Sequence, residues 1–263
     1  MIWELEDMNK KVVEGKLIGQ GEIAPMIYKM MIKAPEVAAS AQCGQFVNVY
    51  PKSKSTLLPR PISISEIGKD TITLVYGVVG EGTREFMHYE TGDSVRISTA
   101  LGNGYTVQSD AKVSVLVGGG IGVPPLVELA KSIPGEKIAV LGFREDPILV
   151  ETLEALGVKV YIATDSGKVG FKGNVIELME AEGIEGDYYY ACGPKVMLRA
   201  LSAFCEKQNK PVQVSMEERM GCGYGVCVGC VTKIKADNKK GYTLKKVCKD
   251  GPVFLGSEVK WDE

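Results

Sequence analysis

Four cysteines near the C-terminus have the residue type and spacing of iron–sulfur ligands. They follow the pattern C-x4-C-x2-C-x17-C, at Cys222, Cys227, Cys230 and Cys248. This is the ligand spacing of plant-type 2Fe–2S clusters. Glycines beside these ligands would let the backbone adopt positive φ and bring amide groups toward sulfur; they are Gly221, Gly223, Gly225 and Gly229. The sequence therefore predicts a 2Fe–2S centre and a role in electron transfer.

Zinc ligation and disulfide bonding are two other possible uses of these cysteines. Structural zinc sites with four cysteines usually have two short-spaced pairs, whereas here three ligands cluster and one is distant. Disulfides are disfavoured because the seven cysteines are an odd number and the N-terminal residues show no secretory pattern. A zinc-stapled interaction module on a cofactor-free scaffold remains the non-enzymatic alternative. Cys43 and Cys205 are interpreted as structural.

Composition narrows the possible classes of chemistry. The chain has 263 residues, 45% apolar and 24% charged, with a net charge of −2. This balance gives no basic footprint for nucleic acid, and no apolar run approaches the roughly 20 residues that span a bilayer. His88 is the only histidine, so a histidine-based triad and a Rieske centre are nearly excluded. We expect a cytoplasmic protein, and a surface or helix-end place for His88.

Two kinds of pattern precede the cysteines. Short segments rich in β-formers, at 45–50, 71–76 and 93–98, are separated by Gly and Pro and predict a small antiparallel barrel over 1–110. Apolar segments at 113–117, 137–143, 158–163 and 187–191 then alternate with helical patterns, which predicts a doubly wound parallel sheet over 111–211. The cysteine-rich remainder, 212–263, is predicted to be a third, small domain.

A glycine turn in the second segment is a candidate nucleotide site. Gly118, Gly119, Gly120 and Gly122 follow an apolar strand and precede Pro124 and Pro125, which favour a helix start. Such a turn lets a phosphate approach backbone amides, although tight glycine turns also join strands to helices in many other folds. Cys192, Gly193 and Pro194 end a later strand and would border the same crevice. Cys192 would then lie near a nicotinamide ring, and a buried thiol at a strand end is an equally compatible interpretation.

The barrel segment carries a second set of candidate cofactor residues. Arg60, Pro61, Ile62 and Ser63 can hold an anionic phosphate, with Arg60 supplying a charged fork. The run from Gly80 through Gly82 to Thr83 is predicted to open a helix, with Thr83 as its N-cap and unpaired amides facing the phosphates. Val75, Tyr76 and Gly77 precede this turn, and Tyr76 would offer an aromatic face to a flavin. Composition alone does not reject an ordinary strand and hairpin with a polar turn.

Together these motifs resemble the ferredoxin–NADP reductase superfamily. Within it, the chain is similar to the electron-transfer subunits of NAD-dependent (class 1B) dihydroorotate dehydrogenases. The likeness covers essentially the whole chain and is most specific over 215–230 and 247–256. It implies a mixed β and α/β fold with a flavin-binding barrel, a nucleotide-binding domain and a 2Fe–2S domain. Arg60–Ser63, Val75–Gly77 and Gly82–Thr83 would bind FAD, and the four cysteines would ligate the cluster.

The same resemblance implies a partner and a pathway. An FMN-containing dihydroorotate dehydrogenase catalytic subunit, in a heterotetramer with two copies of each chain, would deliver electrons through 2Fe–2S and FAD to NAD+ in pyrimidine biosynthesis. NAD is favoured over NADP because Glu145 and Asp146 follow Arg144 and would oppose a 2′-phosphate. The rival is a related flavin/iron–sulfur subunit of a ferredoxin-NADP reductase or sulfide dehydrogenase. Some of those relatives have aspartate as the first cluster ligand, so Cys222 favours the dihydroorotate interpretation.

Overall fold

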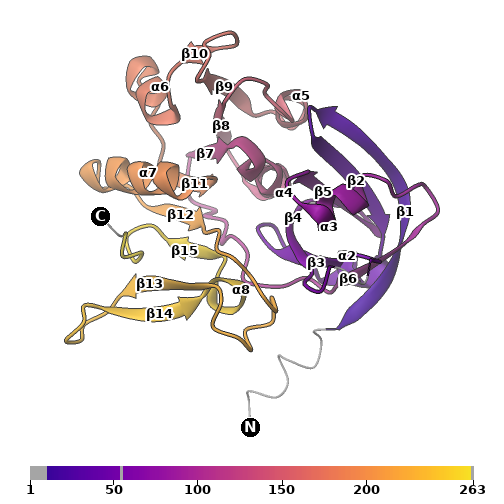
Figure 1. Ribbon diagram of the computed structural model, residues 1–263. Coiled ribbons are helices and arrows are strands. Elements are labelled where there is room, and N and C mark those ends of the chain that lie inside the picture. The colour runs from indigo at the N-terminus through magenta and orange to yellow at the C-terminus, as the bar shows by residue number, and fades with distance from the viewer. Residues whose placement is uncertain (1–10, 54–55, 262–263) are drawn as a thin grey trace.

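A closed antiparallel barrel forms the N-terminal part of the protein. The computed structural model describes residues 11–53 and 56–261 (Figure 1); the first ten residues of the predicted barrel domain lie outside them. The barrel order is β1-β2-β5-β4-β3-β6, and buried side chains such as Leu17, Ile64 and Leu74 fill it. The barrel elements are β1 (Val12–Ala24), β2 (Ile27–Lys33), α2 (Pro35–Ser40), β3 (Phe46–Tyr50), β4 (Arg60–Ile67), β5 (Thr71–Gly77), α3 (Glu81–Phe86) and β6 (Ser94–Ser98). The predicted barrel is confirmed.

A seven-stranded sheet follows, in the order β10-β9-β8-β7-β11-β12-β15. Its strands are β7 (Val113–Gly119), β8 (Glu136–Phe143), β9 (Lys159–Thr164), β10 (Phe171–Lys172), β11 (Tyr188–Cys192), β12 (Val212–Ser215) and β15 (Val253–Leu255). All neighbours pair in parallel except β12 and β15. The connecting elements are the 3₁₀ turn η1 (Gly120–Gly122) and helices α4 (Pro124–Ser132), α5 (Val150–Glu154), α6 (Val175–Glu182) and α7 (Lys195–Lys207).

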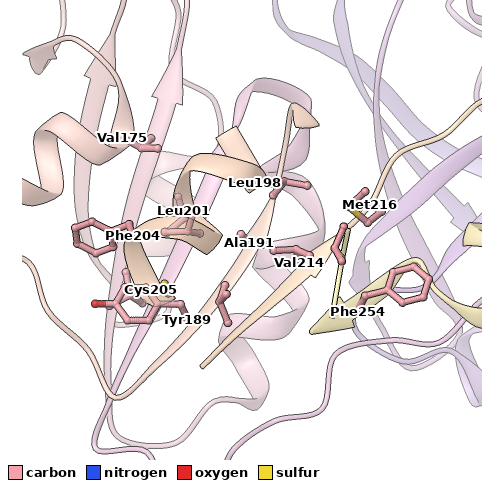
Figure 2. Packing of buried hydrophobic residues seen from close by; sticks show 14 of the residues in the cluster. Val175, Tyr189, Ala191, Leu198, Leu201, Phe204, Cys205, Val214, Met216 and Phe254 are labelled. Atoms are coloured by element: carbon pink, nitrogen blue, oxygen red, sulfur yellow. The ribbon is translucent and has the colours of Figure 1, made fainter. Parts of the chain in front are cut away.

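Two apolar layers show that the sheet is doubly wound. Leu126 and Leu129 of α4 pack on one face with Leu116, whereas Leu198 and Leu201 of α7 pack on the other (Figure 2). Side chains pointing to opposite faces alternate along β7, as the pleat of a strand requires. Both faces of the central strands are therefore buried, which explains why they read as continuous apolar runs in the sequence.

The C-terminal part is built onto this sheet. A hairpin of β13 (Val231–Lys235) and β14 (Tyr242–Lys246) leads into α8 (Val247–Asp250), and β15 then returns to the large sheet (Figure 1). Phe254 of β15 packs in the same core as Val214 of β12 (Figure 2). β12 and β15 follow the predicted domain boundary at 211/212, yet both pair within the large sheet. The boundary therefore remains a prediction. Within the described residues, no helix is long and apolar enough to cross a membrane.

A chain of charged groups joins the barrel to the sheet. The Glu66 carboxylate of β4 lies 2.9 Å from Lys29 Nζ of β2 and 3.3 Å from Lys131 Nζ of α4. Glu128 of α4 contacts Lys131 at 2.9 Å and accepts the backbone N–H of Ile67. Burial alone would raise the pKa of Glu66, but Lys29 and Lys131 outweigh it and lower this pKa. The ionised carboxylate of Glu66 thus contributes a contact between the barrel and helix α4 of the sheet.

Glu66→Gln is expected to lower the free energy of unfolding by about 1 kcal/mol at neutral pH. Because the folded-state pKa of Glu66 is lowered, its contribution is complete above the ordinary carboxyl pKa and is lost as pH falls through the lowered value. Denaturant unfolding at pH 7 and at acid pH measures the difference. Asp70→Asn, at the more exposed Lys33–Asp70 pair, is the control and should change stability less. An equal effect of both substitutions would contradict this role for Glu66.

Candidate functional site

The four cysteines lie in two pairs. Cys222 Sγ and Cys227 Sγ are 3.4 Å apart on the loop between β12 and β13. The backbone N–H of Cys248, in α8, donates to Cys230 Sγ at 3.5 Å. Within 11–53 and 56–261, no three His, Cys, Asp or Glu side chains surround a common point as ligands of one ion. A 2Fe–2S cluster takes two thiolates at each iron. The paired arrangement fits the cluster.

Backbone amides and burial act differently on the two pairs. Burial opposes ionisation of Cys222, but N–H groups of Cys227 and Tyr224 point at its sulfur and lower its pKa to about 6. Burial, together with Cys230, raises the pKa of Cys248 to about 12. Cys222 therefore ionises more readily than Cys248. The backbone amides that point at the Cys222 sulfur are of the kind that tunes the reduction potential of a bound cluster. Gly223 and Gly225 have positive φ as predicted, and Gly221 and Gly229 do not.

The predicted flavin residues meet at the rim of the barrel. Arg60 begins β4, and its guanidinium packs so closely over Gly82 that a Cβ there would lie 2.7 Å from Nε. Pro61, Ile62 and Ser63 continue β4 in register with β3. Val75 is buried in β5, and Gly77 ends that strand. Arg60 and the first turn of α3 thus lie together, as expected of groups that hold a phosphate. Assignment of these residues to FAD remains a prediction.

Two details of the flavin prediction are wrong. Thr83 is not the N-cap of α3, because the helix begins at Glu81 and Gly80 precedes it. Instead, Thr83 Oγ1 accepts the N–H groups of Val79 and Gly80, at 3.0 and 3.2 Å. Tyr76 does not offer a free aromatic face, because its side chain is only 3% exposed, packs edge-on against Phe86 and hydrogen-bonds Gln20. Alternation in β5 turns this ring into the barrel core.

The two predicted nicotinamide turns touch one another. The strand ends carrying Gly118 and Cys192 pair directly, since β7 and β11 are parallel neighbours. A Cβ on Gly119 would lie 2.7 Å from Pro194 Cδ, and one on Gly193 would lie 3.0 Å from Gly119 N. Gly120 and Gly122 form the 3₁₀ turn η1 before α4, which starts at Pro124 as predicted. The chain reverses its winding direction here, which is where open α/β sheets bind ligands.

Cys192 lies at this junction as a protonated thiol. Burial raises its pKa to about 12, although Ser215 acts in the opposite direction. A neutral thiol suits contact with a ring better than ion pairing or nucleophilic attack. Arg144, Glu145 and Asp146 are exposed at the end of β8, beside β7 in the sheet. His88 lies beyond the end of α3 at Phe86, as expected of a helix-end residue.

No sequence pattern predicts the residues that seat the cluster loop on the barrel. Asn48 Nδ2, in β3, donates to the carbonyl of Cys222 at 3.0 Å. The hydroxyls of Tyr50 and Tyr224 are 2.9 Å apart. Asn103 Nδ2, just after the barrel, donates to the carbonyl of Asp250 at 3.1 Å. No motif marks these side chains, because each contact joins segments more than 140 residues apart in the chain.

Arg60→Ala is expected to weaken FAD binding by about tenfold to a hundredfold, because a charge-assisted contact to phosphate is lost. Equilibrium dialysis or titration of the flavin-free protein measures this change. The cluster absorption should persist, since the cysteines lie in another segment. Arg84→Ala, which removes an exposed charge from α3, is the control. Unchanged FAD affinity in Arg60→Ala would contradict the predicted flavin site.

Comparisons with known proteins agree with this geometry. A family model described as the iron–sulfur cluster binding domain of dihydroorotate dehydrogenase B matches residues 217–260. The chain is 38% identical over 248 residues to a protein of Caldanaerobacter subterraneus subsp. tengcongensis, covering 94% of this chain and 98% of the relative. It is 41% identical over 253 residues to one of Bacillus pumilus, covering 92% and 96%. Both relatives are named dihydroorotate dehydrogenase B (NAD(+)), electron transfer subunit.

A solved structure extends the likeness to three dimensions. The NADH-dependent reduced ferredoxin-NADP oxidoreductase, described for flavin-based electron bifurcation, has a chain that superposes with a TM-score of 0.84 at 26% identity. The match covers 94% of this chain and 90% of that chain. The barrel, the parallel sheet and the C-terminal segment are therefore one shared architecture, and the mixed β and α/β fold expected from the motifs is confirmed.

Proposed function

The chain belongs to the family of electron-transfer subunits of dihydroorotate dehydrogenase B (NAD(+)), and from this premise we propose its function. It is an oxidoreductase subunit that passes electrons from the FMN of a dihydroorotate dehydrogenase catalytic subunit through a 2Fe–2S cluster and FAD to NAD+. The observation that carries this proposal is the hydrogen bond from Asn48 of β3 that seats the loop of the Cys222–Cys227 pair on the barrel, beside the strand that bears the flavin motif. The reaction serves pyrimidine biosynthesis.

The side chains of this subunit bind and orient rather than react. FAD, when bound, supplies the exchange between one-electron and two-electron chemistry. Arg60 and the first turn of α3 hold its phosphate groups, and the turns at Gly118–Gly122 and Cys192–Pro194 receive NAD+. The charged contacts of Glu66 fix the barrel relative to the nucleotide sheet. This division of labour explains why a chain with one histidine, placed at a helix end, needs no general acid or base.

The cluster loop is the face on which the catalytic partner docks. The side chains of Val226 and Val228, beside the ligands, are 84% and 73% exposed, and exposed apolar residues of this kind mark interaction sites. Residues 231–250 hold seven lysines and two aspartates in a chain with a net charge of −2. In Figure 1 the strand ends of this basic segment and helix α8 lie beside the loop, whereas the hairpin turn points away from it. The arrangement supports a partner with an acidic rim. We further propose, from the family resemblance alone, an assembly with two copies of each chain.

The double substitution Lys245→Glu and Lys249→Glu, at exposed residues near the end of β14 and in α8, is expected to raise the Kd for the partner by about tenfold at low salt, because charges at an interface rim steer association. Lys16→Glu with Lys69→Glu, on the barrel, is the matched control with the same charge change. Titration by calorimetry across several salt concentrations measures both pairs. An equal effect of the two double substitutions would place the partner elsewhere.

Reconstitution of the pair tests the function itself. The chain is purified anaerobically with a candidate FMN-containing catalytic subunit, and dihydroorotate-dependent reduction of NAD+ is followed. Activity of the pair and not of the catalytic subunit alone is the expected result. A brown chain that oxidises NADH and does not respond to dihydroorotate would instead favour a role like that of the ferredoxin-NADP oxidoreductase. We also propose a cytoplasmic location, since a reducing compartment suits free thiols and an iron–sulfur centre.

A further inference from the structure

Asn48 connects the two redox-centre sites within this subunit. It lies in the middle of β3, where its backbone is in register with Pro61 of the flavin motif on β4. Its backbone N–H donates to Ser98 Oγ of β6 at 2.9 Å, so the residue is fixed from both neighbouring strands. Its side chain points to the cluster loop and donates from Nδ2 to the carbonyl of Cys222 at 3.0 Å. One residue therefore touches the strand beside the flavin motif and the backbone of a cluster ligand.

The contact between Asn48 and the cluster loop is closely packed and leaves one buried polar atom unpaired. Asn48 is only 1% exposed, and its Oδ1 has no hydrogen-bond partner within the described residues. A buried, unsatisfied amide oxygen lowers stability, so general packing does not account for an asparagine here. Gly223, with φ of +76°, lies against the amide, and a Cβ at that position would be 2.5 Å from Nδ2. The loop backbone and the amide thus fit together with no room for another side chain.

We propose that Asn48 is a positioning residue that sets the distance and orientation between the cluster and the flavin site. The inference rests on the proposed function and adds a residue that no ligand or flavin motif contains. Electron tunnelling slows as the distance between two centres grows, so a group that supports the cluster loop affects the rate of transfer between the cluster and the flavin. The Asn48 amide supplies this support at the Cys222–Cys227 pair, the ligand pair on the barrel side of the loop. The Tyr50–Tyr224 hydroxyl contact is a second, more peripheral tie.

The test uses the holo-subunit without its partner. It separates reduction of the flavin by NADH from the later reduction of the cluster. NADH is mixed anaerobically with the FAD- and cluster-loaded chain, and flavin bleaching and cluster reduction are followed by stopped-flow absorption and freeze-quench EPR. Asn48→Ala should reduce the flavin at the wild-type rate and slow cluster reduction by about tenfold to a hundredfold, the loss typical of a small misplacement. It should also alter the EPR signal of the reduced cluster. Tyr50→Phe, which removes one hydroxyl from the same interface, is the matched control and should change little.

A second readout does not depend on the loaded enzyme. Hydrogen exchange of the amides around 222–224 should become faster in Asn48→Ala than in the wild-type chain, while exchange in the barrel strands stays the same. Unchanged cluster reduction, EPR signal and loop exchange would overturn the proposal. Loss of FAD and cluster together with a large fall in Tm would also overturn it, because Asn48 would then be a general core residue. Since no partner subunit is present, failure of dihydroorotate-dependent activity would count against the proposed function and not against this inference.

Discussion

Cys227→Ser is expected to yield a protein that keeps FAD and loses its iron–sulfur absorption. Cys227 Sγ lies 3.4 Å from Cys222 Sγ, so the two would share one iron. A serine hydroxyl does not ionise near neutral pH and is a hard oxygen ligand, whereas iron–sulfur clusters are held by thiolates. The flavin residues lie on β4, β5 and α3, in another segment of the chain. Iron and sulfide content should fall to background while the flavin spectrum persists.

The activity that needs the cluster should be lost in this variant, whereas the activity that needs only the flavin should remain. Electron transfer from the catalytic partner to NAD+ should fall to background in Cys227→Ser, while NADH oxidation by ferricyanide through the flavin continues. Cys43→Ser is the matched control, because Cys43 is a half-buried thiol that lies outside the four-cysteine pattern. Its spectrum and activity should match the wild type. A normal cluster signal in Cys227→Ser would refute the ligand assignment.

The cysteine spacing predicted the cluster because ligands of one small site come mostly from one loop. Three of the four cysteines lie within nine residues, and the fourth follows a single hairpin. The glycine turn at Gly118 and the turn at Cys192 were also correctly placed together. Strands alternating with helices must pair in parallel, and their carboxyl ends then meet at one edge. A local pattern was sufficient to predict the cluster, and a topological rule was sufficient to predict that the two turns lie together.

The errors arose where neighbouring strands decide the outcome. Tyr76 has the residue type of a flavin platform, but the pleat of β5 directs it into the barrel with Phe86 and Gln20. Thr83 has the type of an N-cap, but the chain enters the helix two residues before it. Asn48 has no local pattern at all, because its partner is the carbonyl of Cys222, 174 residues away. Such side-chain directions and long-range contacts depend on packing that one sequence does not specify.

Gly122→Ala is expected to abolish most of the reaction with NADH while FAD and cluster remain. A Cβ at this position would meet the carbonyl oxygen of Cys192 and would lie 2.6 Å from the backbone N of Gly193. Neither group can move freely, because Cys192 pairs with Gly118 on one side and Ser215 on the other. The two turns would therefore be forced apart. Overpacking of this kind costs about 1–3 kcal/mol of stability.

The displaced turns should lower kcat/KM for NADH by about a hundredfold, since small misplacements at a binding site have effects of that size. Stopped-flow reduction of the bound flavin by NADH measures the change, and flavin and cluster spectra report on the rest of the protein. Gly120→Ala provides the comparison in the same turn. Gly120 has φ of +53° and open space around it, so alanine there costs backbone strain of about 1 kcal/mol without a clash. Wild-type NADH kinetics in Gly122→Ala would show that NAD+ binds away from these turns, whereas a loss confined to Gly122→Ala would place it against them.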